Sequence, residues 1–327
     1  MDPAQFLAAS RLVIVAGKGG VGKTTVTATL ARAASRQGLS TLVIEVEGKS
    51  GLTAMFGAPA LGYEETILVA ADEGAGIGEV RARTLTPDEA LLDYLEGSGM
   101  SRISKRLVTS GALDMVSTAV PGIRDILVLG KVRSLEQGGA ADLVLLDAPA
   151  AGHAISFLQS ASGLADAVRL GPINAQAREV LAMLSDPARC QVLLVTLPEE
   201  TPVNELVDTA YQLEDRVGVS LGPVVINGCY PPLPGLDADP KAAAEAAGVT
   251  LRRGEPTALA EAARFRRQRT ALQAEQLARL DDALPLPQLR LPFLFEAELG
   301  PTELDRLAEA LLDGVRALPG EPLGADA

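Results

Sequence analysis

The stretch "RLVIVAGKGGVGKTTVTATLARAASRQG", residues 11–38, constrains the fold of this chain more than any other. Its apolar run at 11–16 has the composition of a buried β-strand. A glycine- and lysine-rich loop follows at 17–24, and an alanine-rich helical pattern then continues to Gly38, a residue suited to the position just after a helix. A strand, a short glycine-rich loop and a helix in this order predict the first unit of a parallel α/β sheet.

Further apolar runs repeat the strand pattern along the chain. They are continuous rather than alternating, which is typical of strands covered by helices on both faces. These runs lie at 41–47, 142–149, 191–198, 222–227 and 288–294. Helical stretches separate most of them, so the sequence predicts a doubly wound, mostly parallel α/β sheet. The length fits one large or two small domains, and we expect a single domain over residues 1–327.

A helical region interrupts this alternation between about residues 84 and 140. It opens with "TPDE", in which Thr86 suits the cap, Pro87 the first helical position and Glu89 the closing side of a capping box. Further helical segments follow, separated by glycine and proline. We interpret the region as a helical subdomain inserted between two strands, joined by a second helical stretch at about 160–185.

The loop "GKGGVGKT" matches the pattern GxxxxGK[ST] in full and lies between a strand and a helix, as a phosphate-binding loop requires. Glycines let successive backbone N–H groups turn toward a phosphate, and the helix N-terminus adds partial positive charge. We expect Lys23 to reach the β- and γ-phosphates of a nucleotide and the Thr24 hydroxyl to ligate Mg²⁺. The predicted nucleotide-binding residues of the loop are Gly17, Gly19, Gly20, Val21, Gly22, Lys23, Thr24 and Thr25.

Two strand ends carry polar side chains that suit a nucleotide site. Asp147 ends the run "DLVLLD", and next to a complete phosphate loop it is expected to orient water on Mg²⁺. Aspartate at a strand end also serves as a cap or turn residue. Asn227 ends the run at 222–227, a place where asparagine is a common turn residue as well. No [NT]KxD guanine motif is present.

Composition excludes several classes of protein. The net charge of −13 argues against a nucleic-acid binder, because such proteins carry an excess of lysine and arginine. For the same reason we interpret the basic run "RFRRQR", within a long helical pattern at 255–284, as a solvated helix face. That pattern places Phe265, Leu272 and Leu280 on one apolar side. With neither a leader pattern nor a membrane-spanning run, we expect a cytoplasmic protein without a direct membrane anchor.

The segment "KGGVGKT", with its second lysine at Lys18, resembles the deviant Walker A signature of one class of P-loop ATPases. That class contains the nitrogenase iron protein, the division-site and partition ATPases, and the arsenite-pump ATPases. Within it the chain is most similar to the arsenical-pump and tail-anchored-protein-targeting ATPase family, especially its actinobacterial anion-transporting branch. The resemblance covers most of the chain through "LVIEVEGKSGLTAMFG" (42–57), "PGIRDILVLGK" (121–131), "DAPAAGHAISFL" (147–158) and "VTLPEETPVNE" (195–205).

This resemblance implies a Mg-ATP-dependent ATPase that acts as a dimer. In the family the signature lysine reaches across the dimer interface to the phosphates held by the other subunit, a role that falls here on Lys18. A cation supplied in this way stabilises charge on the transferred phosphoryl group. The dimer is expected to be a homodimer or a heterodimer with a paralogue, and its helical subdomain to bind a protein or membrane-protein cargo.

The family's first switch has an aspartate that positions the attacking water, and Glu47 occupies the matching place. One extra methylene moves the carboxylate by about one C–C bond, and a shift near 1 Å at a reacting centre can cost on the order of a hundredfold in rate. Slow hydrolysis and a reshaped loop with normal hydrolysis both fit this change. We count Lys18, Lys23 and Glu47 as the predicted catalytic residues, and Glu47 also as a water-mediated Mg²⁺ contact.

By the same resemblance, Asp147, Gly152 and His153 form the second switch, which couples the nucleotide to the helical subdomain. As the only histidine of the chain, His153 also fits a hydrogen-bonded surface residue. Asn227 matches the residue that reads adenine, and Pro292 and Phe293 lie in the matching C-terminal segment.

Departures from the family exclude some of its members' chemistry. The chain has no CxxC pair and only two cysteines, so neither a zinc-clamped dimer nor an iron–sulfur cluster is expected. Three hypotheses remain. The first is the dimeric ATPase with a cargo-binding helical subdomain, and the second is a weakly catalytic regulatory subunit of a heterodimer, motivated by Glu47. The third is a partition or positioning ATPase, which the acidic balance opposes.

Overall fold

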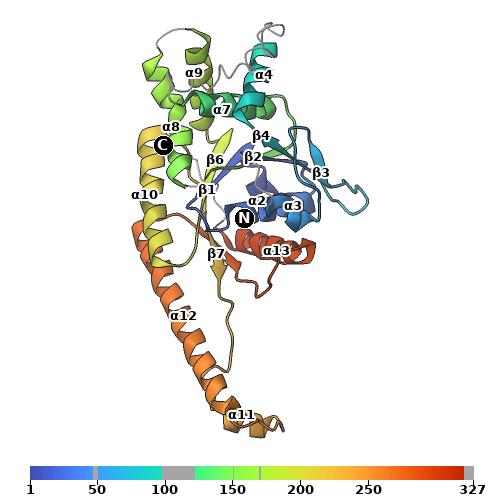
Figure 1. Cartoon of the computed structure of the whole chain (residues 1–327), viewed down its shortest axis with the longest axis vertical. Coiled ribbons are helices and arrows are strands. Elements are labelled where there is room, and N and C mark those ends of the chain that lie inside the picture. The colour runs from blue at the N-terminus through green and yellow to red at the C-terminus, as the bar shows by residue number, and fades with distance from the viewer. Residues whose placement is uncertain (47–50, 98–121, 150, 169–170, 320–327) are drawn as a thin grey trace.

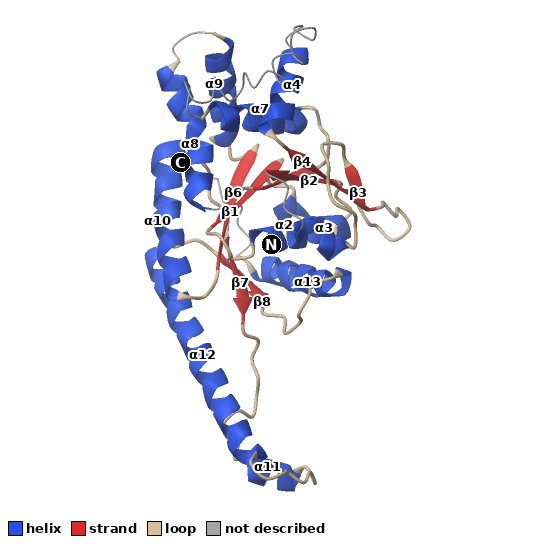
Figure 2. Ribbon diagram, in the orientation of Figure 1, coloured by secondary structure: helices blue, strands red, loops and turns tan. Residues whose placement is uncertain are grey.

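A mostly parallel sheet with helices on both faces forms the centre of the molecule (Figures 1 and 2). The computed structural model describes residues 1–46, 51–97, 122–149, 151–168 and 171–319. The strands of this described part are β1 (Leu12–Gly17), β2 (Thr41–Val46), β3 (Thr66–Val69), β4 (Val80–Leu85), β5 (Leu143–Asp147), β6 (Cys190–Thr196), β7 (Val224–Cys229) and β8 (Gln288–Pro292).

The helices lie between these strands and at both ends of the chain. They are α1 (Pro3–Leu7), α2 (Lys23–Arg36), α3 (Gly51–Phe56), α4 (Pro87–Gly97), α7 (Ile123–Gln137), α8 (Ala151–Ala167), α9 (Pro172–Leu184), α10 (Glu200–Val217), α11 (Pro240–Ala246), α12 (Glu255–Ala283) and α13 (Pro301–Ala317). The long helical pattern at 255–284 is therefore a single helix, as the sequence predicts.

The sheet has the strand order β3-β4-β2-β5-β1-β6-β7-β8, and every neighbouring pair is parallel except β3 with β4. This arrangement confirms the predicted doubly wound α/β fold. β1 lies in the interior of the sheet, between β5 and β6. Strands β2 to β5 lie on one side of β1 and β6 to β8 on the other, and such a switch point leaves a crevice at the carboxyl ends of the strands. The phosphate-loop sequence begins at this point.

Two strands, β3 and β4, are absent from the strands that the sequence predicts. The strand β4 interrupts its apolar residues with Arg81 and Arg83, so it does not give a continuous apolar run. Arg83 is nevertheless buried, with its guanidinium carbon 4.2 Å from the centre of the Tyr63 ring. This cation–π contact stabilises the positive charge of the Arg83 guanidinium in its buried position.

Consecutive residues of the central strands bury their side chains against opposite layers of helices. In β1, Leu12 and Ile14 belong to the core beneath α7, α8, α9 and α10. Val13 and Val15 belong to the second core, beneath α2, α3 and α13. This alternation assigns every strand residue near the phosphate loop to one face or the other.

The helical region after β4 contains α4 and α7, which lie with α9 at one end of the molecule (Figure 1). Thr86 Oγ1 accepts a hydrogen bond from Glu89 N at 3.3 Å, which caps the helix, and it donates to Glu89 Oε2 at 2.7 Å. Glu89 thus contacts the Thr86 hydroxyl and not the backbone N–H that completes the expected capping box. The expected start at residue 84 is two residues early, because 84 and 85 are still part of β4. The helical segments expected between 98 and 121 lie outside the described residues.

The helix α12 extends away from the sheet and carries α11 at its far end (Figure 1). Only its C-terminal half is tied into the body, where Gln273, Gln276 and Leu280 are buried. Phe265 and Leu272 are 63% and 50% exposed, so the apolar side predicted for this helix is not covered at these two positions. We call residues 230–272, which include α11 and this part of α12, the arm.

A buried ion pair connects α7 to the sheet and yields the first prediction. Glu136 of α7 is 2% exposed, and its Oε2 lies 2.5 Å from Nη2 of Arg189, which directly precedes β6. Arg189→Ala leaves this buried carboxylate without its cation, so we expect it to lower the free energy of unfolding by about 2–3 kcal/mol, measured by urea denaturation. Arg306→Ala is the matched control. Its pair with Glu296 is exposed on both sides, so we expect a loss below about 1 kcal/mol. Equal losses in the two variants would contradict the prediction.

Candidate phosphate-binding site

The phosphate loop connects the end of β1 to the start of α2, and two of its glycines fill positions that exclude a side chain. A Cβ on Gly17 would lie 2.4 Å from Val195 O of the neighbouring strand β6. Gly22 has φ +88°, and a Cβ there would lie 2.2 Å from Asn227 Nδ2 of β7. The loop is therefore pressed closely against two adjacent strands, and only glycine fits at these points.

Lys23 opens α2 and folds back over the loop. Its side chain is buried, and its Nζ donates a hydrogen bond to Lys18 O at 3.1 Å, across the loop. This places an ammonium group beside the N-terminal N–H groups of α2, where the helix dipole also favours an anion. The arrangement has the chemistry to bind the phosphates of a nucleotide.

Asp147 and Thr24, both predicted Mg²⁺ residues, are brought together. Asp147 is the last residue of β5 and is 1% exposed. Thr24 Oγ1 donates a hydrogen bond to Asp147 Oδ2 at 2.7 Å. A hydroxyl and a carboxylate at the edge of the phosphate loop are hard oxygen donors of the kind that Mg²⁺ binds, so these residues fit the ion that the sequence predicts.

A second buried carboxylate, Glu45, was missed by sequence reasoning. It pairs in register with Asp147 across β2 and β5, and it is 1% exposed. It follows Val43 by two residues and therefore faces the α2 side of the sheet, as Asp147 does. Two carboxylates on adjacent strands give this face a strong preference for cations. The available signal was a charged residue inside the otherwise apolar run "TLVIEV".

The signature lysine, Lys18, contacts α10 of its own chain. Its Nζ lies 2.5 Å from Oε1 of Glu205, and the two side chains are 39% and 42% exposed. An ion pair this exposed is worth less than about 1 kcal/mol. The pair therefore keeps Lys18 in place only weakly, and a doubly charged phosphate is a stronger partner.

The three residues predicted to contact adenine lie in and just after two neighbouring strands: Asn227 in β7, Pro292 at the end of β8, and Phe293 directly after it. Asn227 Nδ2 donates a hydrogen bond to Val21 O at 3.0 Å, which ties β7 to the phosphate loop. Cys229 pairs with Pro292, and Phe293 N donates to Cys229 O at 2.7 Å. Phe293 is 41% exposed.

A hollow of about 560 Å³ adjoins the loop at Thr24 and Thr25. Its other walls are α3 and residues 298–300, so Asn227, Pro292 and Phe293 do not line it.

Other predicted site residues are only partly described. Glu47 lies outside the described residues. Gly152 and His153 belong to the first turn of α8, five and six residues after Asp147. The second predicted switch thus leads directly into a helix that packs on α7, α9 and α10.

The two cysteines lie in different strands of the sheet. Cys190 begins β6 and is buried, and Cys229 ends β7. Burial raises the pKa of the Cys229 thiol to about 11 and raises that of Cys190 further. Both thiols are therefore protonated at neutral pH.

The loop geometry yields a second prediction. Gly22→Ala puts a methyl group onto Asn227 and strains a left-handed residue, so we expect binding of a fluorescent ATP analogue to fall at least tenfold. Gly218→Ala is the control, because Gly218 also has positive φ, +71°, but its Cβ would meet open space. We expect it to lower stability by about 1 kcal/mol and to leave the affinity for the analogue unchanged. Undiminished nucleotide binding in Gly22→Ala would contradict the close packing of loop and strand.

Comparison with known proteins places this site in a family. Residues 10–176 match the family model described as "Anion-transporting ATPase". ATPase BagA of Mycobacterium tuberculosis is 31% identical over a 339-residue alignment that covers 95% of each chain. A putative arsenical pump-driving ATPase of Halobacterium salinarum is 26% identical over 94% of this chain and 45% of its own length. ATPase GET3 of Chaetomium globosum is 23% identical over 92% of this chain and 90% of its own.

The chain belongs to the anion-transporting ATPase family, which confirms the resemblance that its motifs carry. It is a P-loop ATPase of the arsenical-pump and GET3 type. Within the part of the chain that the structure describes, no helix combines the length and the apolarity needed to cross a membrane.

Proposed function

We propose that this chain is a cytoplasmic, Mg-ATP-dependent ATPase that works as a dimer, in which ATP binding closes the interface and hydrolysis reopens it. The complete phosphate loop with two lysines carries the proposal. Lys23 is buried and folded over its own loop, whereas Lys18 is half-exposed and held by one weak ion pair. The first lysine suits a phosphate bound by the same chain. The second is placed at the surface, where a phosphate held by another chain can reach it.

In this proposal each residue of the site has a separate task. The loop N–H groups and Lys23 bind the β- and γ-phosphates, and Thr24 and Asp147 hold Mg²⁺, which supplies charge neutralisation on those phosphates. Asn227, Pro292 and Phe293 lie on the side of the adenine base. Lys18 exchanges Glu205 for a phosphate of the partner subunit and stabilises charge on the transferred group.

Closure is coupled to the helical region through the chain itself. Asp147 contacts Thr24 at the loop, and α8 begins four residues later. Because α8 packs on α7, α9 and α10, a displacement at Asp147 is passed to these helices through rigid contacts. We propose that this movement reshapes a binding surface for a protein or membrane-protein cargo on α4, α7 and α9. The names of the arsenical-pump and GET3 relatives support an ATPase of this type.

A second candidate function rests on Glu47. If the longer side chain misplaces the attacking water, the chain binds nucleotide but hydrolyses it slowly, and it regulates a paralogue within a heterodimer. Single-turnover hydrolysis separates the two functions. A rate equal to that without enzyme, restored by the added paralogue, would favour the regulatory subunit.

The role of Lys23 is tested directly. Lys23→Ala removes the ammonium group from the loop, so we expect the ATPase rate to fall at least a hundredfold in a phosphate-release assay. Arg306→Ala, which changes the same charge far from the loop in sequence, should keep the wild-type rate. An ATPase rate that survives in Lys23→Ala would overturn the assignment of the site.

The role of Lys18 is tested through oligomeric state. With Mg-ATP, wild-type protein should shift toward dimer in light scattering coupled to gel filtration, and Lys18→Ala should remain monomeric. Glu205→Gln frees Lys18 from its ion pair, so it should dimerise at an ATP concentration equal to or lower than wild type. An ATP-dependent dimer that forms unchanged in Lys18→Ala would contradict the trans-acting lysine.

A further inference from the structure

Exposed apolar side chains gather on the arm and at its root. Among the described residues, most of the large hydrophobic side chains that are exposed lie between residues 233 and 295. Leu233, Val249 and Leu259 are 57%, 56% and 48% exposed. Folded proteins rarely expose so many apolar groups together unless the surface binds something.

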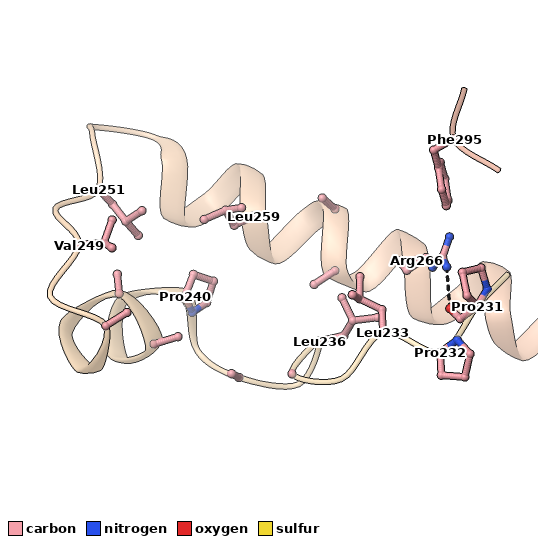
Figure 3. Close-up of a pocket in the computed structure, with 17 residues that line it drawn as sticks. Pro231, Pro232, Leu233, Leu236, Pro240, Val249, Leu251, Leu259, Arg266 and Phe295 are labelled. Atoms are coloured by element: carbon pink, nitrogen blue, oxygen red, sulfur yellow. Dashed lines mark hydrogen bonds between the residues drawn. The ribbon is translucent and has the colours of Figure 1, made fainter. Parts of the chain in front are cut away.

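These side chains border a hollow of about 820 Å³ between α12 on one side and α11 with the loop 231–239 on the other. Figure 3 shows Leu259 on α12 facing the side where Val249, Leu251 and Pro240 lie, with Leu233 and Leu236 nearer the other end. Alanines of both helices complete the walls. We call this space the arm hollow. Its volume falls within the range of 300–1,000 Å³ typical of small-molecule sites.

A positively charged side chain, that of Arg266, lies at one end of the arm hollow. Arg266 is the only charged residue among those that line it within the described chain. Its guanidinium carbon lies 4.0 Å from the centre of the Tyr230 ring and 5.1 Å from that of Phe295. Its Nη2 donates to Pro231 O at 2.9 Å, while the buried Nε has no hydrogen-bond partner in the described structure. The guanidinium therefore retains donors for an anion.

The shape of the arm hollow suits a slender occupant. An α-helix with its side chains is about 10–12 Å across, too wide to enter between α11 and α12, which contact each other. A bilayer surface is flat and cannot fill a hollow between two walls. Along α12 the lining residues run from Leu259 to Arg266, about 10 Å at 1.5 Å per residue, so an extended hydrocarbon chain can lie along this wall.

We propose that the arm hollow binds a free long-chain aliphatic carboxylate. Its hydrocarbon chain lies between α11 and α12, where each buried methylene gains about 0.8 kcal/mol, and its carboxylate accepts hydrogen bonds from Arg266. The site is separate from the phosphate loop and goes beyond the proposed ATPase function. It does not depend on dimer closure or on hydrolysis.

Calorimetric titration of the full-length protein with dodecanoate, below its micelle concentration, tests the proposal. We expect saturable binding of one dodecanoate per chain. Arg266→Gln removes a charge-assisted hydrogen bond and should raise the Kd about tenfold, whereas Arg264→Gln, an exposed arginine two residues away, should not change it. Ala263→Phe fills the arm hollow and should abolish binding. Ala260→Phe, on the same helix but outside the lining, should bind as wild type does.

Several outcomes would overturn the proposal. Dodecyltrimethylammonium has the same chain length with a positive head group, and its binding as tightly as dodecanoate would remove the role of Arg266. Absence of saturable dodecanoate binding to wild type would also overturn it. So would binding to anionic phosphatidylglycerol vesicles without binding of dodecanoate, which would make the arm a membrane contact. If Ala263→Phe changed only the oligomeric state, the surface would be a contact between chains. Circular dichroism of each variant separates misfolding from a lost site.

Discussion

The phosphate loop depends on close contact between three parallel strands. Val195 O of β6 stands where a Cβ of Gly17 would be, and the Asn227 amide of β7 occupies the corresponding place beside Gly22. The same amide donates to Val21 O and holds the middle of the loop. The strand order therefore determines the shape of the loop, because β1 must be followed in the sheet by β6 and then β7 for these contacts to exist. A change of register in β6 would move Val195 O and remove the constraint.

Opposite charges meet at the carboxyl edge of this sheet. Lys23 and the N-terminus of α2 supply positive charge from one side, and Asp147 and Glu45 supply negative charge from the face below. All three side chains are at least nine-tenths buried, where charges interact more strongly than in water. Such an edge suits an anionic ligand that binds together with a cation. Lys18 does not belong to this buried set of charges, since it is paired at the surface with Glu205 of α10.

Much of the fold could be predicted from the sequence because parallel strands that are covered on both faces consist of continuous apolar runs. The strands β3 and β4 were not predicted because neither is such a run. Arg83 of β4 is buried against the Tyr63 ring and paired with Glu65, and no local pattern reveals the contact with the ring. In the site, Thr24 was predicted from the loop motif and Asp147 from its place at a strand end, and the two are hydrogen-bonded. Glu45 was not predicted, because its importance comes from strand pairing with Asp147 across about 100 residues of sequence. The contact of Lys18 with Glu205 is equally non-local.

The arm is rooted in the same two strands that carry the predicted adenine residues. It leaves the sheet after β7, and the chain returns through α12 into β8, so Asn227 and Phe293 flank its base. Aromatic rings connect this base to the arm hollow. The Phe293 ring lies 5.4 Å from that of Tyr230 and 4.8 Å from that of Phe295, and the Arg266 guanidinium lies over the latter two. Cation–π contacts of this kind contribute about 0.5–2 kcal/mol, so any ligand that turns Arg266 away also loosens the rings against which Phe293 packs. The arm hollow and the strand end beside the phosphate loop are thus joined by one small cluster of side chains.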